Sequence, residues 1–356
     1  MPKPKKANRT TYKILKKKPC KHMNQKATIT QKGAIILGKH VACDAYDENT
    51  PLRVVTHAHA DHLIGLQQSL RTSEKVLMTS ATKDLIDVML SPLTLMSGNV
   101  ETLEYEKPMR YNEETITFYP ADHILGSAQV LVEDKEGTRI AYTSDFRIDN
   151  TPILETDTLV IEATYGSPHC QRPPQQEIKT QLITTVEKGL KQGTVYIFSY
   201  HGKLQEIMQI LHTAQIKAPF ITPERVFQIT KICQKHGMHT GQILHAETAE
   251  AQQLLTKNQP AIAFHHINTK ARIGSDKFRI TVSGWEFNTP IRQTTNKDYT
   301  ITLSDHSDYN GLIEYIRQSK PKQLITDNYR EGHAQTLANE TNKKLNIPAI
   351  ALPTRK

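Results

Sequence analysis

Long apolar runs are missing from this chain of 356 residues, whose mean hydropathy is −0.51. Nothing in the sequence approaches the roughly 18 consecutive apolar residues of a membrane-spanning helix, so we expect no membrane partner. The first 30 residues also lack the apolar core of a secretory signal. We therefore expect an intracellular protein of the cytoplasm or nucleoid, or of the nucleus in a eukaryote.

Cysteine is scarce, and its spacing forms no CxxC pair. The four cysteines are scattered over the chain, at Cys20, Cys43, Cys170 and Cys233. Widely separated cysteines predict free thiols in a reducing compartment, and they argue against a disulfide-stapled fold.

Acidic residues are absent before Asp44. Residues 1–43 hold 12 of the 45 lysines and arginines, which leaves 33 basic and 36 acidic residues for the rest of the chain. Residues 1–26 are therefore predicted to form a basic, flexible arm. Such an arm can simply be solvated, or it can bind the phosphates of a nucleic acid without sequence preference. A membrane surface or a localisation signal remains as a further alternative.

The densest group of chemically active side chains is His-Ala-His-Ala-Asp-His at residues 57–62. It lies between a predicted strand at residues 53–56 and a predicted helix at residues 63–70. Because a strand alternates its faces, His57 and His59 point the same way, and the turn after them can present Asp61 and His62 from a second direction. This arrangement favours two adjacent metal ions over one closed tetrahedral site. The alternative is an exposed polar loop with incidental histidines.

Short alternating runs interleaved with helical patterns fill residues 27–166, which predicts an α/β fold of the αββα sandwich type. A proline-rich break at residues 167–174 is followed by helices and strands of a different texture. The first pattern resumes near residue 278. We therefore expect one domain from residues 27–166 and 278–356, interrupted by a smaller α/β insert at residues 167–277.

The motif at residues 57–62 resembles that of the metallo-β-lactamase superfamily. Residues 119–127 look like its third motif and offer His123, and residues 139–145 look like its fourth motif and offer Asp145. Asp44 resembles the first motif, an acid that orients a metal ligand from behind.

Three further segments are similar to the β-CASP nucleases of that superfamily. Residues 159–166, with Glu162, resemble motif A, and residues 302–308, with His306, resemble motif B. Residues 195–206 look like the start of the β-CASP insert. Within the branch, the chain most resembles the exonuclease-like proteins associated with DNA ligases, followed by the crosslink-repair and Artemis nucleases. The nucleases that process RNA 3′ ends share motifs A and B.

The resemblance implies two divalent metal ions, with zinc favoured and manganese as the alternative. The first ion would be bound by His57, His59, His123 and Asp145. The second would be bound by Asp61, His62 and the shared Asp145. The catalytic residues would be Asp61, which orients the attacking water, His306, which protonates the leaving oxygen or holds the phosphate, and Glu162, which orients His306.

One residue departs from the family pattern. Where RNA-processing relatives have a histidine, after the strand at residues 323–326, this chain has Asp327. Asp327 either completes the second metal site, which would favour manganese, or leaves that site incomplete.

A phosphate-binding group is expected in the cleft between the two domains, because hydroxyls and a lysine at a helix N-terminus can hold phosphate. Its members would be Ser199, Tyr200, Lys203 and Thr164. The alternative for Lys203 is a solvated position on a helix.

The sequence thus predicts a metal-dependent DNA nuclease, a 5′-to-3′ exonuclease of DNA repair or end processing, with a ligase or helicase as a possible partner. The first alternative is a ribonuclease of RNA 3′-end processing or turnover. The second is a nucleic-acid-binding scaffold with an impaired site. The insert, Glu162 and His306 argue against a hydrolase of small molecules.

Overall fold

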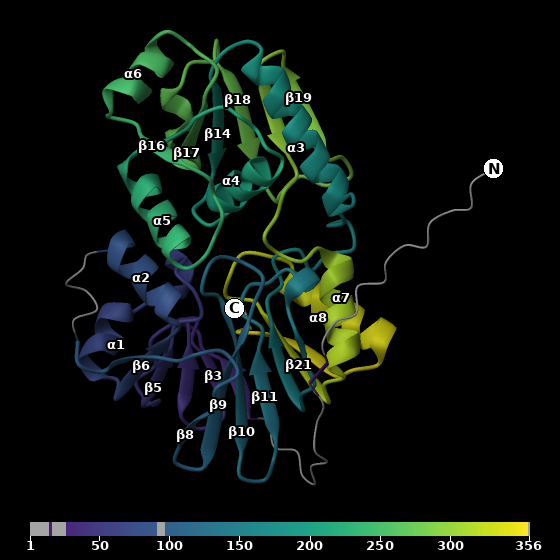
Figure 1. Ribbon diagram of the computed structural model, residues 1–356. Helices are drawn as coiled ribbons and strands as arrows, with labels where there is room; N and C mark the ends of the chain where they lie inside the picture. Colours follow the sequence, from purple (N-terminus) through teal and green to yellow (C-terminus); the bar gives the residue numbers. More distant parts are fainter. Residues whose placement is uncertain (1–13, 16–25, 91–96, 355–356) are drawn as a thin grey trace.

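The computed structural model describes residues 14–15, 26–90 and 97–354, and it folds into two lobes (Figure 1). The predicted basic arm, residues 1–26, lies outside the described residues except for Ile14, Leu15 and Lys26. There β1 (Ile14–Leu15) pairs in parallel with β12 (Ile153–Leu154).

Two sheets packed face to face form the first lobe. One sheet has the order β2 (Ala27–Ile29), β3 (Ile35–Leu37), β4 (Val41–Cys43), β5 (Leu52–Val54), β6 (Lys75–Met78) and β7 (Val100–Thr102). The other has the order β22 (Ala349–Leu352), β21 (Gln323–Asp327), β13 (Thr158–Ile161), β11 (Arg139–Tyr142), β10 (Ala128–Asp134), β9 (Glu114–Pro120) and β8 (Met109–Tyr111). The apolar residues of both inner faces merge into one core, with Leu37, Leu52, Phe118, Val130 and Ile325 among its members.

Helices cover the outer face of each sheet, which completes the four layers. α1 (Leu66–Thr72) and α2 (Ser80–Met89) pack on the first sheet through Leu66, Leu70, Leu85 and Ile86. α7 (Tyr309–Ser319) and α8 (Ala334–Leu345) pack on the second through Leu312, Ile316 and Leu337. Each helix buries one apolar stripe at helical spacing. The predicted αββα sandwich is confirmed.

The second lobe is the insert, built on one largely parallel sheet. Its order is β16 (Ile243–His245), β15 (Phe220–Thr222), β17 (Ile262–His266), β14 (Val195–Ser199), β18 (Phe278–Val282), β20 (Asp298–Ile301) and β19 (Ile291–Thr295). Its helices are α3 (Gln175–Leu190), α4 (Lys203–Thr213), α5 (Glu224–Lys235) and α6 (Ala249–Thr256). Only the edge pair β19–β20 is antiparallel among the described pairings of this sheet.

The insert extends beyond the predicted boundary at residue 277. The strand at residues 278–282, expected to return to the first lobe, is β18, which pairs with β14 inside the insert. β20 then pairs with β18, and Leu303 still belongs to the apolar core of the insert. An alternating strand can fit either sheet, because its pattern specifies a buried face and not a partner strand. The chain rejoins the first lobe only after Leu303.

The two lobes are joined on either side of a cavity of about 570 Å³. On one side Arg147 of the first lobe lies 2.7 Å from Oε1 of Glu206 on α4. On the other side, α5 packs against α2 (Figure 1), and His236 Nε2 lies 2.7 Å from Asp84 Oδ2. His59 and His123 line the same cavity, which therefore opens onto the predicted metal ligands.

No helix of the described residues is long and apolar enough to cross a membrane. Cys43, Cys170 and Cys233 are free and buried.

Candidate active site

The predicted ligands come from strand ends that meet at the edge of the first lobe facing the insert. His57 follows β5, His123 follows β9, and Asp145 follows β11. The chain then turns sharply. Ala60–His62 forms a single 3-10 turn, and α1 begins only at Leu66, later than the predicted start at residue 63. Gly65 makes this delay possible. Its φ is 69°, and a Cβ atom at this position would lie 2.6 Å from Tyr46 Cβ, so any other residue would be strained here.

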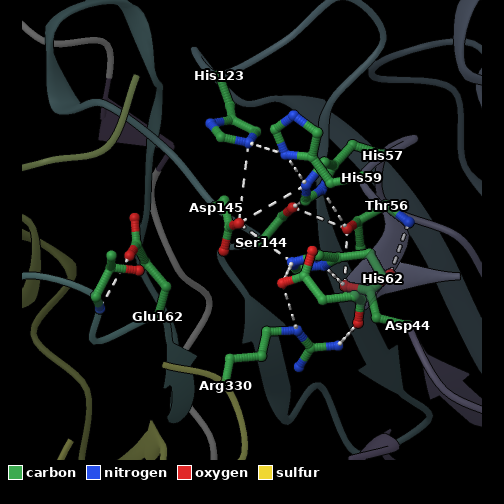
Figure 2. A network of polar contacts seen from close by, with 12 residues as sticks. Asp44, Thr56, His57, His59, His62, His123, Ser144, Asp145, Glu162 and Arg330 are labelled. Atoms are coloured by element: carbon green, nitrogen blue, oxygen red, sulfur yellow. Dashed lines mark hydrogen bonds and ion pairs between the residues drawn. The ribbon is translucent and has the colours of Figure 1, made fainter. Parts of the chain in front are cut away.

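Four of the predicted ligands converge on one point (Figure 2). The ligand atoms of His57, His59, His123 and Asp145 all lie within 4.8 Å of one another. His59 Nδ1 is 3.2 Å from His57 Nε2 and 3.0 Å from His123 Nε2, and Asp145 Oδ2 is 3.7 Å from His57 Nε2. Atoms about 2 Å from a common ion stand roughly 3–4 Å apart, so this first ligand group fits a tetrahedral zinc ion.

The second nitrogen of His57 is held by hydroxyls. Its Nδ1 lies 3.1 Å from Thr56 Oγ1 and 3.2 Å from Ser144 Oγ. Ser144 has a φ of 57°, a left-handed conformation that places its hydroxyl under His57 and turns Asp145 toward the ligands. Partners of this kind fix the ring so that Nε2 is presented to the metal. Sequence reasoning missed Thr56 and Ser144, although each directly precedes a predicted ligand.

Backbone carbonyls orient the other two imidazoles. His59 Nε2 lies 3.3 Å from the carbonyl oxygen of His201, and His123 Nδ1 lies 3.1 Å from that of Asp305. His201 belongs to the insert, so the second lobe helps to set the metal-facing nitrogen of His59. The sequence gives no signal for a contact made by a backbone oxygen.

The three imidazoles are kept neutral, which is the form that binds metal. Burial lowers the pKa of His57 well below its ordinary value and lowers the pKa of His59. Burial also lowers the pKa of His123 to about 3. The first ligand group is therefore ready to bind an ion without first losing protons at neutral pH.

The second predicted group is also assembled, but with fewer donors. His62 Nε2 lies 3.1 Å from Asp145 Oδ2 and 3.4 Å from Asp61 Oδ2. Asp44 stands behind it, with Oδ2 2.7 Å from His62 Nδ1 and Oδ1 accepting from the Thr56 backbone N–H. Asp44 is fully buried, and it occupies the supporting position that the resemblance implies.

The sequence left open whether Asp327 completes this group, and in the structure both of its carboxylate oxygens have other partners. Its Oδ1 accepts from the Tyr329 backbone N–H at 2.9 Å, and its Oδ2 accepts from Arg330 Nη1 at 2.7 Å. Both oxygens are thus committed to the turn that follows β21. Sequence reasoning judged Asp327 by its position after a strand and missed Arg330, three residues on, which lies beside the predicted site (Figure 2).

Glu162, directly after β13, and His306, just before α7, lie in contact with each other. Glu162 Oε1 lies 3.1 Å from His306 Nδ1, and Oε2 accepts from the Thr164 backbone N–H at 3.2 Å. The His306 ring lies 4.7 Å from the ring of His123, beside the first ligand group. Burial disfavours the charged imidazole, but Glu162 and Asp145 outweigh it and raise the pKa of His306 to about 9. His306 is therefore protonated at neutral pH.

The expected phosphate-binding group is only partly available. The Ser199 hydroxyl is buried and donates to the Val282 carbonyl oxygen at 3.1 Å. Lys203 Nζ is buried and lies 2.9 Å from Asp305 Oδ1. These two side chains are engaged within the protein, so their expected role does not agree with the structure. Tyr200 is 56% exposed and Thr164 is half-buried, and both remain candidates.

No family model matches the chain. Its relatives in sequence include the following three. The "RNase J-like protein" of Methanocaldococcus jannaschii is 30% identical over 92% of this chain and 94% of its own length. The "probable DNA ligase" of Opitutus terrae is 24% identical over 80% of this chain, which spans only 27% of that longer protein. An "uncharacterized protein in lig 3′ region" of Acidianus ambivalens is 36% identical over 38% of this chain and 99% of its own length.

The fold is also shared with a solved structure, a protein of unknown function from Enterococcus faecalis. It has a TM-score of 0.59 and 13% sequence identity, and the match covers 87% of this chain and 81% of that one.

Proposed function

We propose that this chain, which belongs to the β-CASP nuclease branch of the metallo-β-lactamase superfamily, cleaves DNA as a 5′-to-3′ exonuclease in repair or end processing. That it is a nuclease acting on nucleic acid follows from the family. We propose three further points: the preference for DNA over RNA, the 5′-to-3′ direction of cleavage, and the role in repair or end processing.

The observation that carries the chemistry is the convergence of the first ligand group beside the Glu162–His306 pair. His57, His59, His123 and Asp145 would hold a divalent ion, for which we propose zinc with manganese as the alternative. When bound, such an ion supplies Lewis-acid polarisation of the scissile phosphodiester.

The remaining steps fall to side chains of this chain. Asp61 carries a side chain that is 60% exposed, and its interaction with His62 lowers its pKa against the effect of partial burial. It is therefore an ionised acceptor that can orient an attacking water. His306, held protonated by Glu162, can donate a proton to the leaving oxygen. Asp61 can thus orient the water, and His306 can protonate the leaving oxygen.

The preference for DNA rests on the relatives whose names refer to a ligase. The chain matches a probable DNA ligase over 80% of its own length, and it matches an uncharacterized protein whose name places it in a "lig 3′ region". A ligase, or a helicase that opens the duplex, is accordingly proposed as a partner.

A ribonuclease is the second candidate, and one observation favours it. One relative, which matches along almost the whole of both chains, is named RNase J-like. The motifs and ligands described above suit either sugar, because they act on the phosphate.

A direct competition separates the two. Single-stranded DNA and RNA of matched sequence, each labelled at the 5′ end, are incubated with the full chain and zinc or manganese. We expect faster loss of the DNA label, released as mononucleotides. Faster cleavage of RNA would reverse the assignment. Labelled fragments of intermediate length would show endonuclease action or cleavage from the 3′ end, and would contradict cleavage from the 5′ end. Unchanged cleavage by a metal-free Asp145→Ala variant would contradict the metal-dependent mechanism.

A further inference from the structure

We propose that the guanidinium of Arg330 takes the place of a second resident metal ion, so that the protein holds one ion tightly, in the first ligand group, and the His62 side of the site is neutralised by a side chain. The proposal deepens the function above and rests on it for the first ion.

Arg330 is built into the second group. Its Nη2 donates to the Asp61 backbone carbonyl at 3.2 Å, and its Nε lies 4.0 Å from Asp61 Oδ2. Its Nη1 donates to Asp327 Oδ2 at 2.7 Å. The side chain is only 9% exposed. Three contacts on a planar fork fix the guanidinium in one place, which a flexible surface arginine would not achieve.

The charge of Arg330 is directed at the same carboxylates that a second ion would need. Its positive charge favours the ionised form of Asp44, which supports His62, and contributes to the lowered pKa of Asp44. Arg330 is ion-paired with Asp327, and its Nε lies 4.0 Å from Asp61 Oδ2. Figure 2 shows Arg330 beside His62. A divalent ion between His62 and Asp61 would be repelled by this fixed cation at close range.

The donor set of the second group is incomplete for a second reason. His62, Asp61 and Asp145 provide three side chains, and Asp145 is shared with the first group. The chemically suitable fourth donor, Asp327, has both oxygens occupied by the turn and by Arg330. The same arginine therefore repels the ion and removes its last ligand.

The first ligand group shows the opposite arrangement. Its imidazoles are supported by the hydroxyls of Thr56 and Ser144 and by two backbone carbonyls, all of which are neutral. These supports add no positive charge, and the protonated His306 lies beside the group, with its ring 4.7 Å from that of His123. The two halves of the site thus each have their own source of positive charge, but only the first requires a metal.

Metal content tests the proposal without depending on activity. The full chain is loaded with excess zinc or manganese and desalted into metal-free buffer, and bound metal is measured by mass spectrometry. We expect about one ion per chain for the wild type. Arg330→Met removes the cation and frees Asp327, so we expect about two ions per chain. The double variant Arg330→Met/Asp327→Asn should return to about one. Arg317→Met, at an exposed arginine paired with Glu314, is the matched control.

Two results overturn the proposal: two tightly held ions in the wild type, or a folded Arg330→Met protein that still retains one. If Arg330→Met does not fold, electron paramagnetic resonance of the manganese-loaded wild type decides. An isolated ion supports the proposal, and a spin-coupled pair overturns it. Retention of one ion by a protein that cleaves neither DNA nor RNA would contradict the proposed function and leave this inference intact.

Discussion

Asp145 and Asp327 lie at corresponding ends of strands in one sheet, yet their carboxylates have different partners. Asp145 follows β11, and Asp327 ends β21, with β13 between them in parallel register. The left-handed turn at Ser144 directs Asp145 toward the imidazoles. Asp327 instead accepts from its own turn and from Arg330. Asp145 thus faces the three imidazoles, whereas Asp327 is ion-paired with a buried arginine.

The largest expected effect is the loss of the shared ligand. Asp145→Asn removes the anionic donor of both groups, so we expect bound metal to disappear and cleavage to fall by more than about 100-fold. Metal analysis and a nuclease assay measure this. Asp149→Asn, at a carboxylate that is 51% exposed, provides the control. Metal retained at the wild-type level would show that Asp145, like Asp327, is not a metal ligand.

Loss of His306 should separate chemistry from metal binding. His306→Ala removes the proton donor but none of the first ligand group, so we expect cleavage to fall by about 10²–10⁴-fold with bound metal unchanged. His239→Ala, at an exposed histidine of the insert, should have no effect. If His306→Ala also lost its metal, His306 would have to be counted among the ligands.

The ion pair between Asp327 and Arg330 is expected to stabilise the fold and to have no effect on metal binding by the first ligand group. Asp327→Asn leaves the buried Arg330 without its carboxylate, which we expect to cost about 3 kcal/mol in the free energy of unfolding. Denaturant titration gives this value, and metal content should remain that of the wild type. A stable variant that has lost an ion would restore Asp327 to the metal ligands.

The smallest expected effect is a shift in pH dependence. His306 must be protonated to donate, and its pKa is raised to about 9, so cleavage should decline as the pH rises above about 9. Glu162→Gln removes a negative charge that raises this pKa, so the decline should begin at a lower pH. Rates measured across about pH 6–10 at saturating metal test this. An unchanged profile would mean that another group limits the alkaline side.

Much of the fold and of the first ligand group could be predicted from short segments. Strand alternation predicted a common direction for His57 and His59. In the structure β5 ends at Val54, and both histidines lie in the bend that follows it. His123, Asp145 and Glu162 each follow an alternating run. The boundary at residue 277 could not be placed, because β18 has the burial pattern of a strand that would fit either sheet.

The expected phosphate-binding group likewise shows what the sequence cannot predict, which is whether a polar side chain already has a partner within the fold. Ser199 and Lys203 have suitable chemistry at a suitable helix, and the sequence cannot show that Val282 and Asp305 already satisfy them.

The sequence by itself determined the class of fold and the nuclease family and predicted the first ligand group, because these depend on residue types at fixed local spacing. The tertiary structure decided which of the remaining polar groups are free to act. Arg330 lies three residues beyond Asp327 in the chain, but its contact with Asp61 spans 269 residues. The packing of these two distant segments brings the Arg330 cation beside the second ligand group, because local spacing does not specify which far segments meet.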